Sequence, residues 1–273
     1  MGLPSPRVRR RNSLNRSSHR AGQFQSRPPT SGTKTTSTRS VHFVWTGNKE
    51  TGEKYAARAR RANFGCGMTP TPGWENFDNS LSIRLAQVPA LVRVATRLGL
   101  IDPKRRAFID FAMSNRIKSA DVRKPLPFAS ESMDVIYASH MVEHLDRPSA
   151  RYFAEESLRV LAPGGYIRLA VPDLAAKLEE YRVSGDADGF VGSLHMNMDL
   201  PRTWQQSVRE RLVSFRGHRW MYDEASLTKL LIEAGFTQVH RVAPGETGIP
   251  EPGELDLFER VGESLYVEAV KPN

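Results

Sequence analysis

Apolar residues in the second half of the chain fall into short continuous runs separated by amphipathic stretches. Residues 133–139 and 166–171 are runs of the kind that forms strands buried on both faces of a parallel sheet. Between them, residues 149–161 repeat apolar side chains at helical spacing, and Pro163-Gly164-Gly165 breaks this helix. The pattern predicts a strand–helix–strand unit.

Two more helices and two more strands follow this unit. Residues 174–181 and 223–234 have helical periodicity, and Gly235 is a typical residue to end the second helix. Residues 237–242 and 264–270 have the composition of strands, and a Gly/Pro-rich loop separates them. Because no helix connects these two strands, we expect an antiparallel pair at the end of the sheet.

The pattern is weaker in the first half of the chain. Its predicted elements are a helix over 51–62, a strand that ends at Phe64, a helix over 80–99, and extended segments at 108–111 and 116–122. Pro125 and Pro127 restrict their own backbone and that of the residues before them, so we expect a loop there.

Strands that alternate with helices are typical of an α/β domain with a mostly parallel sheet. We predict one such domain over residues 42–273. Periodicity fades over residues 185–220, which we interpret as an inserted lid or substrate-binding segment.

Charge is distributed unevenly along the 273 residues. Residues 1–62 carry 14 basic and 2 acidic side chains, whereas residues 63–273 carry 25 basic and 28 acidic ones. Residues 1–41 have almost no large apolar residues, so we predict a disordered basic tail. The simplest interpretation is a solvated tail. A nucleic-acid arm, a membrane-surface arm and an organelle transit peptide stay open as alternatives.

The single cysteine, Cys66, excludes an intrachain disulfide and favours a reducing, cytoplasmic location. No apolar run approaches the roughly 18 residues that a membrane span needs. No apolar stretch follows the basic start, so we expect neither a secretory signal nor a membrane partner.

Residues 63–78 contain the strongest candidate for ligand binding. Gly65 and Gly67 flank Cys66, which lets the backbone turn sharply and approach a ligand closely. Asp78 follows a second short apolar run, where a carboxylate can accept hydrogen bonds from a ribose diol. The pattern predicts a nucleotide-type cradle in which backbone N–H groups hold a polar ligand end.

The order of several further motifs resembles the class I S-adenosylmethionine-dependent methyltransferases of the broad type 11 group. The resemblance covers about residues 60–270. The motifs that carry it are the glycine loop 63–67, Asp78, Ala120-Asp121 with Leu126-Pro127-Phe128, the run 133–137, His140-Met141-Val142-Glu143-His144-Leu145 and Arg159-Val160-Leu161-Ala162-Pro163-Gly164-Gly165.

This resemblance implies a doubly wound, mostly parallel, seven-stranded Rossmann-like sheet with an antiparallel last strand, and S-adenosyl-L-methionine as the cofactor. It places Gly65, Cys66 and Gly67 near the methionine part and Asp78 on the ribose hydroxyls. The other residues that it implies at the cofactor are Asn63, Asp121, Val122, Leu126, Ser139 and His140. The chain departs from the family pattern at Asn63, where an acid is usual, and lacks the third glycine of the loop.

His140-Met141-Val142-Glu143-His144 also matches the H-x-x-E-H pattern of a zinc-peptidase class. That motif needs a long helix, and Arg147-Pro148 cut this one short. We therefore expect no metal: His144 packs beneath a loop and Glu143 is solvated. Similarly, we expect Cys66 to fill space rather than to act as a reactive thiol.

The methyl acceptor is predicted to be a small molecule or a sugar, with O-methylation favoured. The candidates for a general base are His140, Asp173 and His218, in that order. A nucleic-acid-binding protein or RNA methyltransferase that uses the basic tail, and a non-catalytic cofactor-binding fold, are the alternatives. A nicotinamide oxidoreductase is disfavoured because the G-x-G-x-x-G spacing is missing.

Overall fold

The computed structural model describes residues 59–196 and 217–273, which all belong to the compact unit Gly47–Asn273. The predicted tail, the proposed domain start at residue 42, most of the predicted helix 51–62 and the greater part of the insert lie outside these ranges. Within them, no helix is long and apolar enough to cross a membrane.

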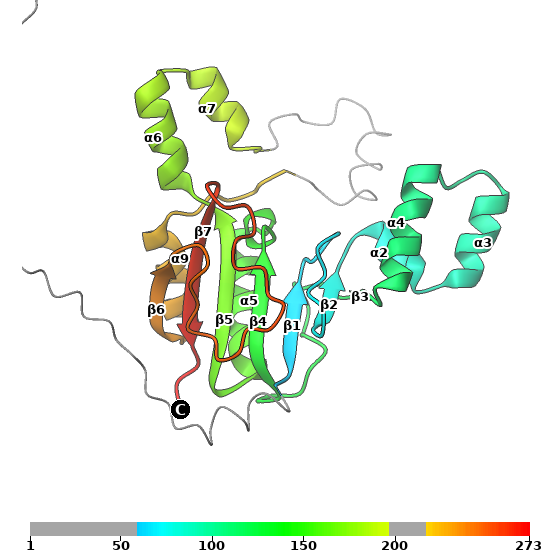
Figure 1. Cartoon of the computed structure of the whole chain (residues 1–273), viewed down its shortest axis with the longest axis horizontal. Coiled ribbons are helices and arrows are strands. Elements are labelled where there is room, and N and C mark those ends of the chain that lie inside the picture. Colours follow the sequence, from blue (N-terminus) through cyan, green and yellow to red (C-terminus); the bar gives the residue numbers. More distant parts are fainter. Residues whose placement is uncertain (1–58, 197–216) are drawn as a thin grey trace, which may run out of the picture. The chain divides into compact units, whose positions relative to one another are not determined.

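Seven strands form a single sheet in the order β3-β2-β1-β4-β5-β7-β6 (Figure 1). All neighbours are parallel except β7, which is antiparallel to both β5 and β6. The strands are β1 (Arg61–Phe64), β2 (Glu75–Asp78), β3 (Lys118–Ser119), β4 (Met133–Ser139), β5 (Leu161–Pro172), β6 (Thr237–Val242) and β7 (Ser264–Val270). The predicted Rossmann-like sheet with its terminal antiparallel pair is confirmed.

Strand β5 is longer than its apolar run predicts. Pro163-Gly164-Gly165 does not separate helix from strand, because the strand already begins at Leu161 and carries the three residues as an irregularity in its pairing with β4. A Cβ atom on Gly165 would lie 2.8 Å from the carbonyl oxygen of Ala162. Only glycine fits there, so Gly165 permits a close backbone approach within the sheet and does not break the helix.

Helices α5 (Arg147–Val160) and α9 (Glu224–Glu233) cover one face of the sheet. Asp146 and Asp223 cap them by accepting hydrogen bonds from backbone N–H groups of the first turn. Ile136 and Ala138 of β4 join the large apolar cluster under these helices. The helices therefore cover the face of β4 to which every second residue points.

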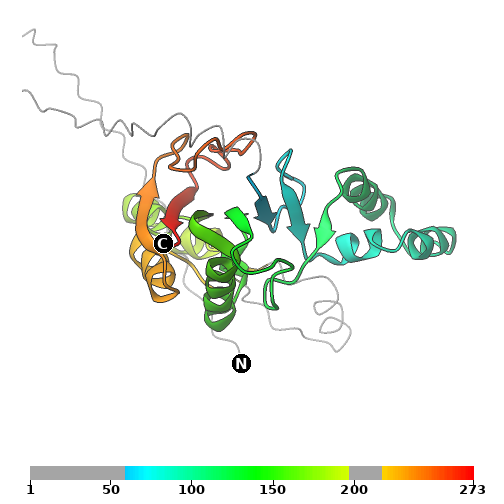
Figure 2. The same ribbon diagram turned by 90° about the horizontal axis from the view of Figure 1, so that it is seen from below.

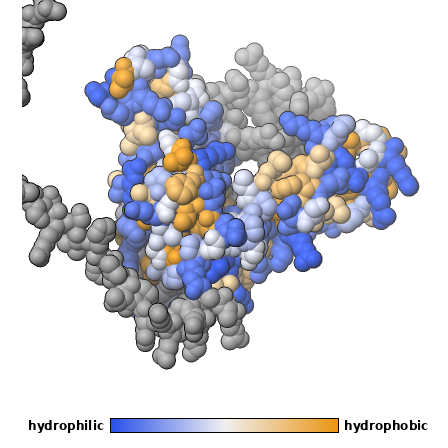
Figure 3. Space-filling view, in the orientation of Figure 1, coloured by the Kyte–Doolittle hydropathy of each residue, from blue (hydrophilic) through white to orange (hydrophobic). Residues whose placement is uncertain are grey.

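The opposite face of the central strands is covered by the irregular segment 243–263 (Figure 2). Val135 and Tyr137, which alternate with Ile136 and Ala138 along β4, form a second cluster with Ile249 and other residues of this segment. This loop therefore covers the sheet face that a second layer of helices covers in a doubly wound sheet. Phe258 and Val261 of this segment are more than half exposed. Apolar surface is visible over this part of the molecule (Figure 3).

A buried ion pair fastens this segment to the sheet. Arg168 on β5 lies opposite Glu268 on β7, and the two fully buried side chains meet at 2.5 Å. Glu268 also accepts hydrogen bonds from Thr247 Oγ1 (2.6 Å) and Gly248 N (2.7 Å). The Arg168 guanidinium in turn donates to the Glu246 carbonyl (2.9 Å). Glu268 thus has three polar partners and Arg168 has two, which offsets part of the cost of burying the two charges.

The helices between β2 and β3 differ most from the sequence pattern. The predicted helix 80–99 is two helices, α2 (Leu81–Ala86) and α3 (Pro89–Arg97), because Pro89 cannot continue the first and starts the second. The extended segment predicted at 108–111 is wrong, since it lies inside α4 (Pro103–Ser114). Of the segment 116–122 only the two residues of β3 are paired. These helices form an apolar cluster of their own.

The remaining predictions are close to the observed elements. Helix α6 (Leu174–Ser184) is one turn longer than predicted, and the described part of the insert contains α7 (Ala187–Ser193). The predicted helix 51–62 is wrong at its end, where Arg61 already belongs to β1 and pairs with β4. Neighbouring strands, rather than the helix-forming residues before it, decide the conformation there.

Replacing Glu268 by alanine should lower the free energy of unfolding by about 3–5 kcal/mol, because Arg168 then stays charged and buried without its carboxylate. Urea unfolding followed by circular dichroism measures this loss. The control is Lys118→Ala, which removes the exposed Lys118–Glu75 pair and should cost at most about 1 kcal/mol. Equal losses in the two variants would show that the buried pair does not anchor the segment.

Candidate functional site

The predicted site residues gather at the carboxyl ends of β1, β2, β4 and β5, the upper edge of the sheet in Figure 1. The strand order reverses between β1 and β4, and open α/β sheets bind ligands outside such a reversal point. Loop 65–74, Asp78, Ser139 and His140 all follow or end these strands. The topology therefore brings together residues that are up to about 75 positions apart in the sequence.

The connection between β1 and β2 is unusually short. Parallel strands usually need a crossover of a dozen or more residues with a helix, yet residues 65–74 contain none. Asn63 supports the loop, because its side-chain amide donates to Thr71 Oγ1 (3.1 Å). Thr71 N in turn donates to the Asn76 side chain (2.8 Å). Asn63 is buried and braces the loop, so the residue that departs from the family pattern has a structural role.

The backbone N–H groups of the glycine loop do not form the predicted cradle. Gly65 N and Cys66 N both donate to the Phe77 carbonyl, at 2.8 and 3.1 Å. Gly67 N donates to the Asp78 carboxylate at 3.2 Å. These donors are used inside the protein, so the loop is held against β2 instead of pointing its N–H groups at a ligand.

Gly65 and Gly67 differ in the space around them. Both have positive φ, but a Cβ on Gly65 would come within 2.6 Å of the Met141 side chain. A Cβ on Gly67 would meet nothing within 4 Å. The loop is therefore tightly packed at Gly65 and open at Gly67, and open space beside Gly67 fits the close approach of a cofactor.

Cys66 packs into the apolar cluster of α2 and α4. Burial, together with the nearby negative charge of Asp78, raises the pKa of the Cys66 thiol to about 12. A thiol with such a pKa stays protonated near neutral pH and is a poor nucleophile. The structure supports the expectation that Cys66 fills space.

Asp78 keeps capacity for a ribose. Its Oδ1 accepts from Ser80 N at 2.7 Å and its Oδ2 from Gly67 N at 3.2 Å. Each carboxylate oxygen has two lone pairs, so both can still accept one hydroxyl hydrogen. The half-buried carboxylate thus fits the diol that the cofactor would present beside the open side of Gly67.

The residues expected around the adenine are less open. Arg123 binds both oxygens of Asp121 at 2.8 Å and holds the pKa of that carboxyl below its usual range. An adenine amino group would have to share this carboxylate with Arg123. Val122 and Leu126 are buried in the main apolar cluster, where they can form the floor of such a site.

Ser139 and His140 end strand β4 beside the reversal point. His140 has φ 46°, a conformation that non-glycine residues adopt rarely and that is enriched at functional sites. Its Nδ1 accepts from the Arg260 guanidinium at 3.1 Å, and its Nε2 lies 2.8 Å from Ser264 Oγ. The sequence offers no signal for these two partners, which are 120 and 124 residues away from His140.

Asp173 follows β5 but its carboxylate is already engaged. One oxygen accepts from the N–H groups of Ala175 (2.9 Å) and Ala176 (3.3 Å) and so caps α6. The other oxygen binds Arg241 at 3.2 Å. Asp173 thus has a clear structural role, and it is the weakest of the three predicted bases.

Glu143 contradicts the sequence interpretation. The sequence interpretation predicts a solvated Glu143, but its side chain is completely buried beneath residues 217–220. Arg219 N and Trp220 N donate to its backbone carbonyl at 2.7 and 3.1 Å. His144 does pack beneath this segment, since its Nδ1 lies 3.2 Å from the Gly217 carbonyl oxygen. The contact that buries Glu143 has a sequence separation of more than 70 residues, so local pattern could not show it.

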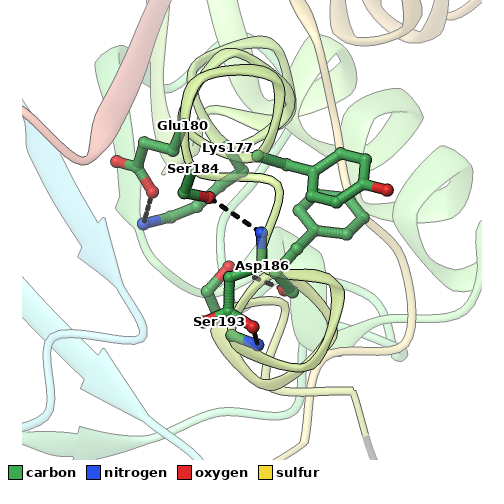
Figure 4. A pocket seen from close by; sticks show the side chains of 8 residues that line it. Lys177, Glu180, Ser184, Asp186 and Ser193 are labelled. Atoms are coloured by element: carbon green, nitrogen blue, oxygen red, sulfur yellow. Dashed lines mark hydrogen bonds and ion pairs between the residues drawn. The ribbon is translucent and has the colours of Figure 1, made fainter. Parts of the chain in front are cut away.

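A separate small hollow lies between α6 and α7 (Figure 4). Its walls include the Lys177–Glu180 ion pair and Asp186, which caps α7. None of the predicted cofactor or catalytic residues lines it, and we assign it no role in the reaction.

Comparisons with known proteins agree with the motif order. The family model described as a methyltransferase domain matches residues 91–169. A search of curated proteins finds no match.

Solved structures of similar fold include methyltransferases from several sources. The S-adenosylmethionine-dependent methyltransferase SibL in its apo form is 15% identical, with 81% of this chain covered and a TM-score of 0.40, and the match spans only 52% of SibL. An S-adenosylmethionine-dependent methyltransferase from Thermotoga maritima is 18% identical, with 78% of this chain and 83% of that chain covered and a TM-score of 0.39. One from Methanosarcina mazei is 16% identical, with 78% and 91% covered and a TM-score of 0.40.

Similarity at this level transfers no substrate. A methyltransferase domain model thus matches residues 91–169, and the motifs and strand order are those expected of the class I S-adenosylmethionine-dependent methyltransferases.

Proposed function

We propose that the chain transfers a methyl group to a hydroxyl oxygen of a small-molecule or sugar acceptor. The observation that carries this proposal is His140, an imidazole held at positive φ at the end of β4, beside the reversal point of the sheet. When bound, S-adenosylmethionine supplies an already activated, electrophilic methyl group on its sulfonium. The acceptor oxygen forms the new bond to this carbon, the carbon–sulfur bond breaks, and its electron pair stays on sulfur.

The protein then has two tasks, to position the acceptor and to take up its proton. In the structure, the Arg260 N–H points at Nδ1 of His140, so Nδ1 is the nitrogen without a proton and Nε2–H donates to Ser264 Oγ. Arg260 is exposed. An acceptor hydroxyl that displaces Arg260 would meet the Nδ1 lone pair, which then receives the hydroxyl proton.

The fixed partner on the other ring nitrogen supports this role. Ser264 Oγ accepts from Nε2–H and itself donates to the Glu259 carbonyl at 3.3 Å. A base whose second nitrogen has a hydrogen-bonded partner keeps one tautomer and one orientation. His218 belongs to a different group of side chains, and Asp173 is already engaged by α6 and Arg241.

The cofactor is proposed to lie between Gly67, Asp78 and the end of β4. Asp78 would accept from the ribose hydroxyls, Asp121 would contact the adenine, and Val122 and Leu126 would lie under the ring. The open side of Gly67 and the free lone pairs of Asp78 support this placement.

One observation favours the non-catalytic alternative. Gly65 N and Cys66 N donate to the Phe77 carbonyl and are therefore not available to hydrogen-bond a ligand. Cofactor binding without turnover on any acceptor would support that alternative. The nucleic-acid alternative depends on residues 1–41, which lie outside the described ranges.

The variant Asp78→Ala should bind S-adenosylmethionine at least tenfold more weakly, about 1.4 kcal/mol, because the ribose loses its acceptor. Isothermal titration calorimetry on the full chain measures this change for both the cofactor and S-adenosylhomocysteine. Asp110→Ala is the matched control, since the only ion pair of that exposed acid within residues 59–196 and 217–273 is with Arg106 on α4. Unchanged affinity in Asp78→Ala would remove the ribose contact from the proposal.

The variant His140→Gln should lower kcat on a hydroxyl acceptor by about 10²–10⁴-fold, the usual contribution of a general base. S-adenosylhomocysteine formation, measured over a panel of sugars, phenols, amines and RNA, identifies the acceptor class and the rate. His240→Ala, an exposed histidine on β6, is the control. Turnover on RNA or amines only, or a His140→Gln variant with the full rate, would contradict the proposal.

A further inference from the structure

Three side chains near the end of β4 form a group that the methyl transfer reaction does not use. Glu143 and His144 lie on the short 3-10 turn Val142–His144, and His218 lies within residues 217–220. Ligand atoms from the three side chains all lie within 4.8 Å of one another. The group therefore has the size of a metal-binding site.

Glu143 is the most unusual member of this group. Its side chain has no exposed surface, and neither carboxylate oxygen accepts a hydrogen bond from any residue that the structure describes. The nearest cationic or potentially cationic atoms are Nδ1 of His140 at 3.5 Å and Nε2 of His144 at 4.0 Å. A buried carboxylate without hydrogen bonds is costly unless a positive charge compensates it.

His144 is oriented as metal-binding histidines usually are. Its Nδ1 lies 3.2 Å from the Gly217 carbonyl oxygen, which can only accept, so Nδ1 carries the proton. Nε2 is then the nitrogen with a lone pair, and it is the atom that faces Glu143. A hydrogen bond from the second ring nitrogen to a backbone carbonyl fixes the tautomer and the ring direction of a ligand.

His218 presents a second nitrogen to the same place. Its Nδ1 is buried and has no hydrogen-bond partner among the described residues. Its ring centroid lies 5.1 Å from that of His144. A buried imidazole nitrogen with no hydrogen-bond partner can offer its lone pair to a metal ion.

We propose that Glu143, His144 and His218 bind one divalent transition metal ion of the zinc type. Two imidazole nitrogens and one carboxylate oxygen are a common zinc ligand set, and three protein ligands leave a fourth position for water or an exogenous oxygen. In a tetrahedral site the ligand atoms lie about 3.3 Å apart. The present spacing of up to 4.8 Å requires the side chains to close by up to about 1.5 Å.

The backbone already holds the two segments in place for this site. His218 N donates to the His195 carbonyl at 2.9 Å, and the Arg219 and Trp220 N–H groups donate to the Glu143 carbonyl. The ligand set also differs from the H-x-x-E-H pattern in the sequence. His140, the first histidine of that pattern, is engaged by Arg260 and Ser264, and the distant His218 takes its place.

The test is zinc binding by the full, tag-free chain in the absence of cofactor and acceptor. After treatment with a chelator, the protein should take up about one tightly held Zn²⁺, counted by mass spectrometry and by competition with a chromogenic chelator. Co²⁺ should give the intense visible absorption of a tetrahedral ion. Failure of methyl transfer would leave these readouts untouched, so the two proposals can fail separately.

The variants His144→Ala and His218→Ala should each weaken Zn²⁺ binding by at least about 100-fold, more than the 10–100-fold typical of losing a supporting residue. His240→Ala should bind like the unchanged protein, because that histidine is exposed on β6. Zn²⁺ should also raise the thermal unfolding midpoint of the unchanged protein and of His240→Ala, but not of the two ligand variants.

Uptake of no tight Zn²⁺ by the folded, unchanged protein would overturn the proposal. Uptake that survives in both His144→Ala and His218→Ala would overturn it as well, since histidines elsewhere in the chain would then hold the ion. Circular dichroism in the presence of a chelator shows whether each variant is folded. If an alanine variant unfolds, the isosteric Glu143→Gln takes its place and must lose the tight site for the proposal to stand.

Discussion

The buried pair of Arg168 and Glu268 determines how the second face of the sheet is covered. Its two charges hold residues 246–248 at the start of the segment 243–263, whose far end carries Glu259 and Arg260. Glu259 accepts from the Tyr137 and Tyr266 hydroxyls, both at 2.7 Å, which brings Arg260 to His140. The side chains around the proposed base therefore depend on an ion pair in the interior of the sheet.

The glycine loop beside the proposed cofactor site is held by hydrogen bonds within the protein. Residues 65–74 alone join strands β1 and β2. The N–H groups of residues 65–67 donate to the Phe77 carbonyl and to the Asp78 carboxylate. Side chains such as Asn63 replace the helix that such a crossover usually contains. The open side of Gly67 and the unused lone pairs of Asp78 remain, so the proposed cofactor contact relies on the carboxylate more than on backbone amides.

Two neighbouring parts of the chain after β4 contact different segments of the fold. His140 turns toward the segment 243–263, where Arg260 and Ser264 hold its ring. Three residues later, Glu143 turns away from solvent and toward the segment that returns at residue 217. The positive φ of His140 changes the direction of the chain at this point. One short stretch can thus serve the proposed base and the proposed metal site at once.

Apolar runs and motif spacing by themselves determined the α/β class, the bounds of β4, β6 and β7, and Asp78 at the end of a strand, because such features are local. The prediction of a strand at 108–111 was wrong because local pattern does not include packing. The prediction of one helix over 80–99 was wrong because it did not take the effect of Pro89 into account. Only the tertiary structure decided that Glu143 is buried and that His218 lies beside it. Contacts between residues more than 70 positions apart depend on how the elements pack, which periodicity does not record.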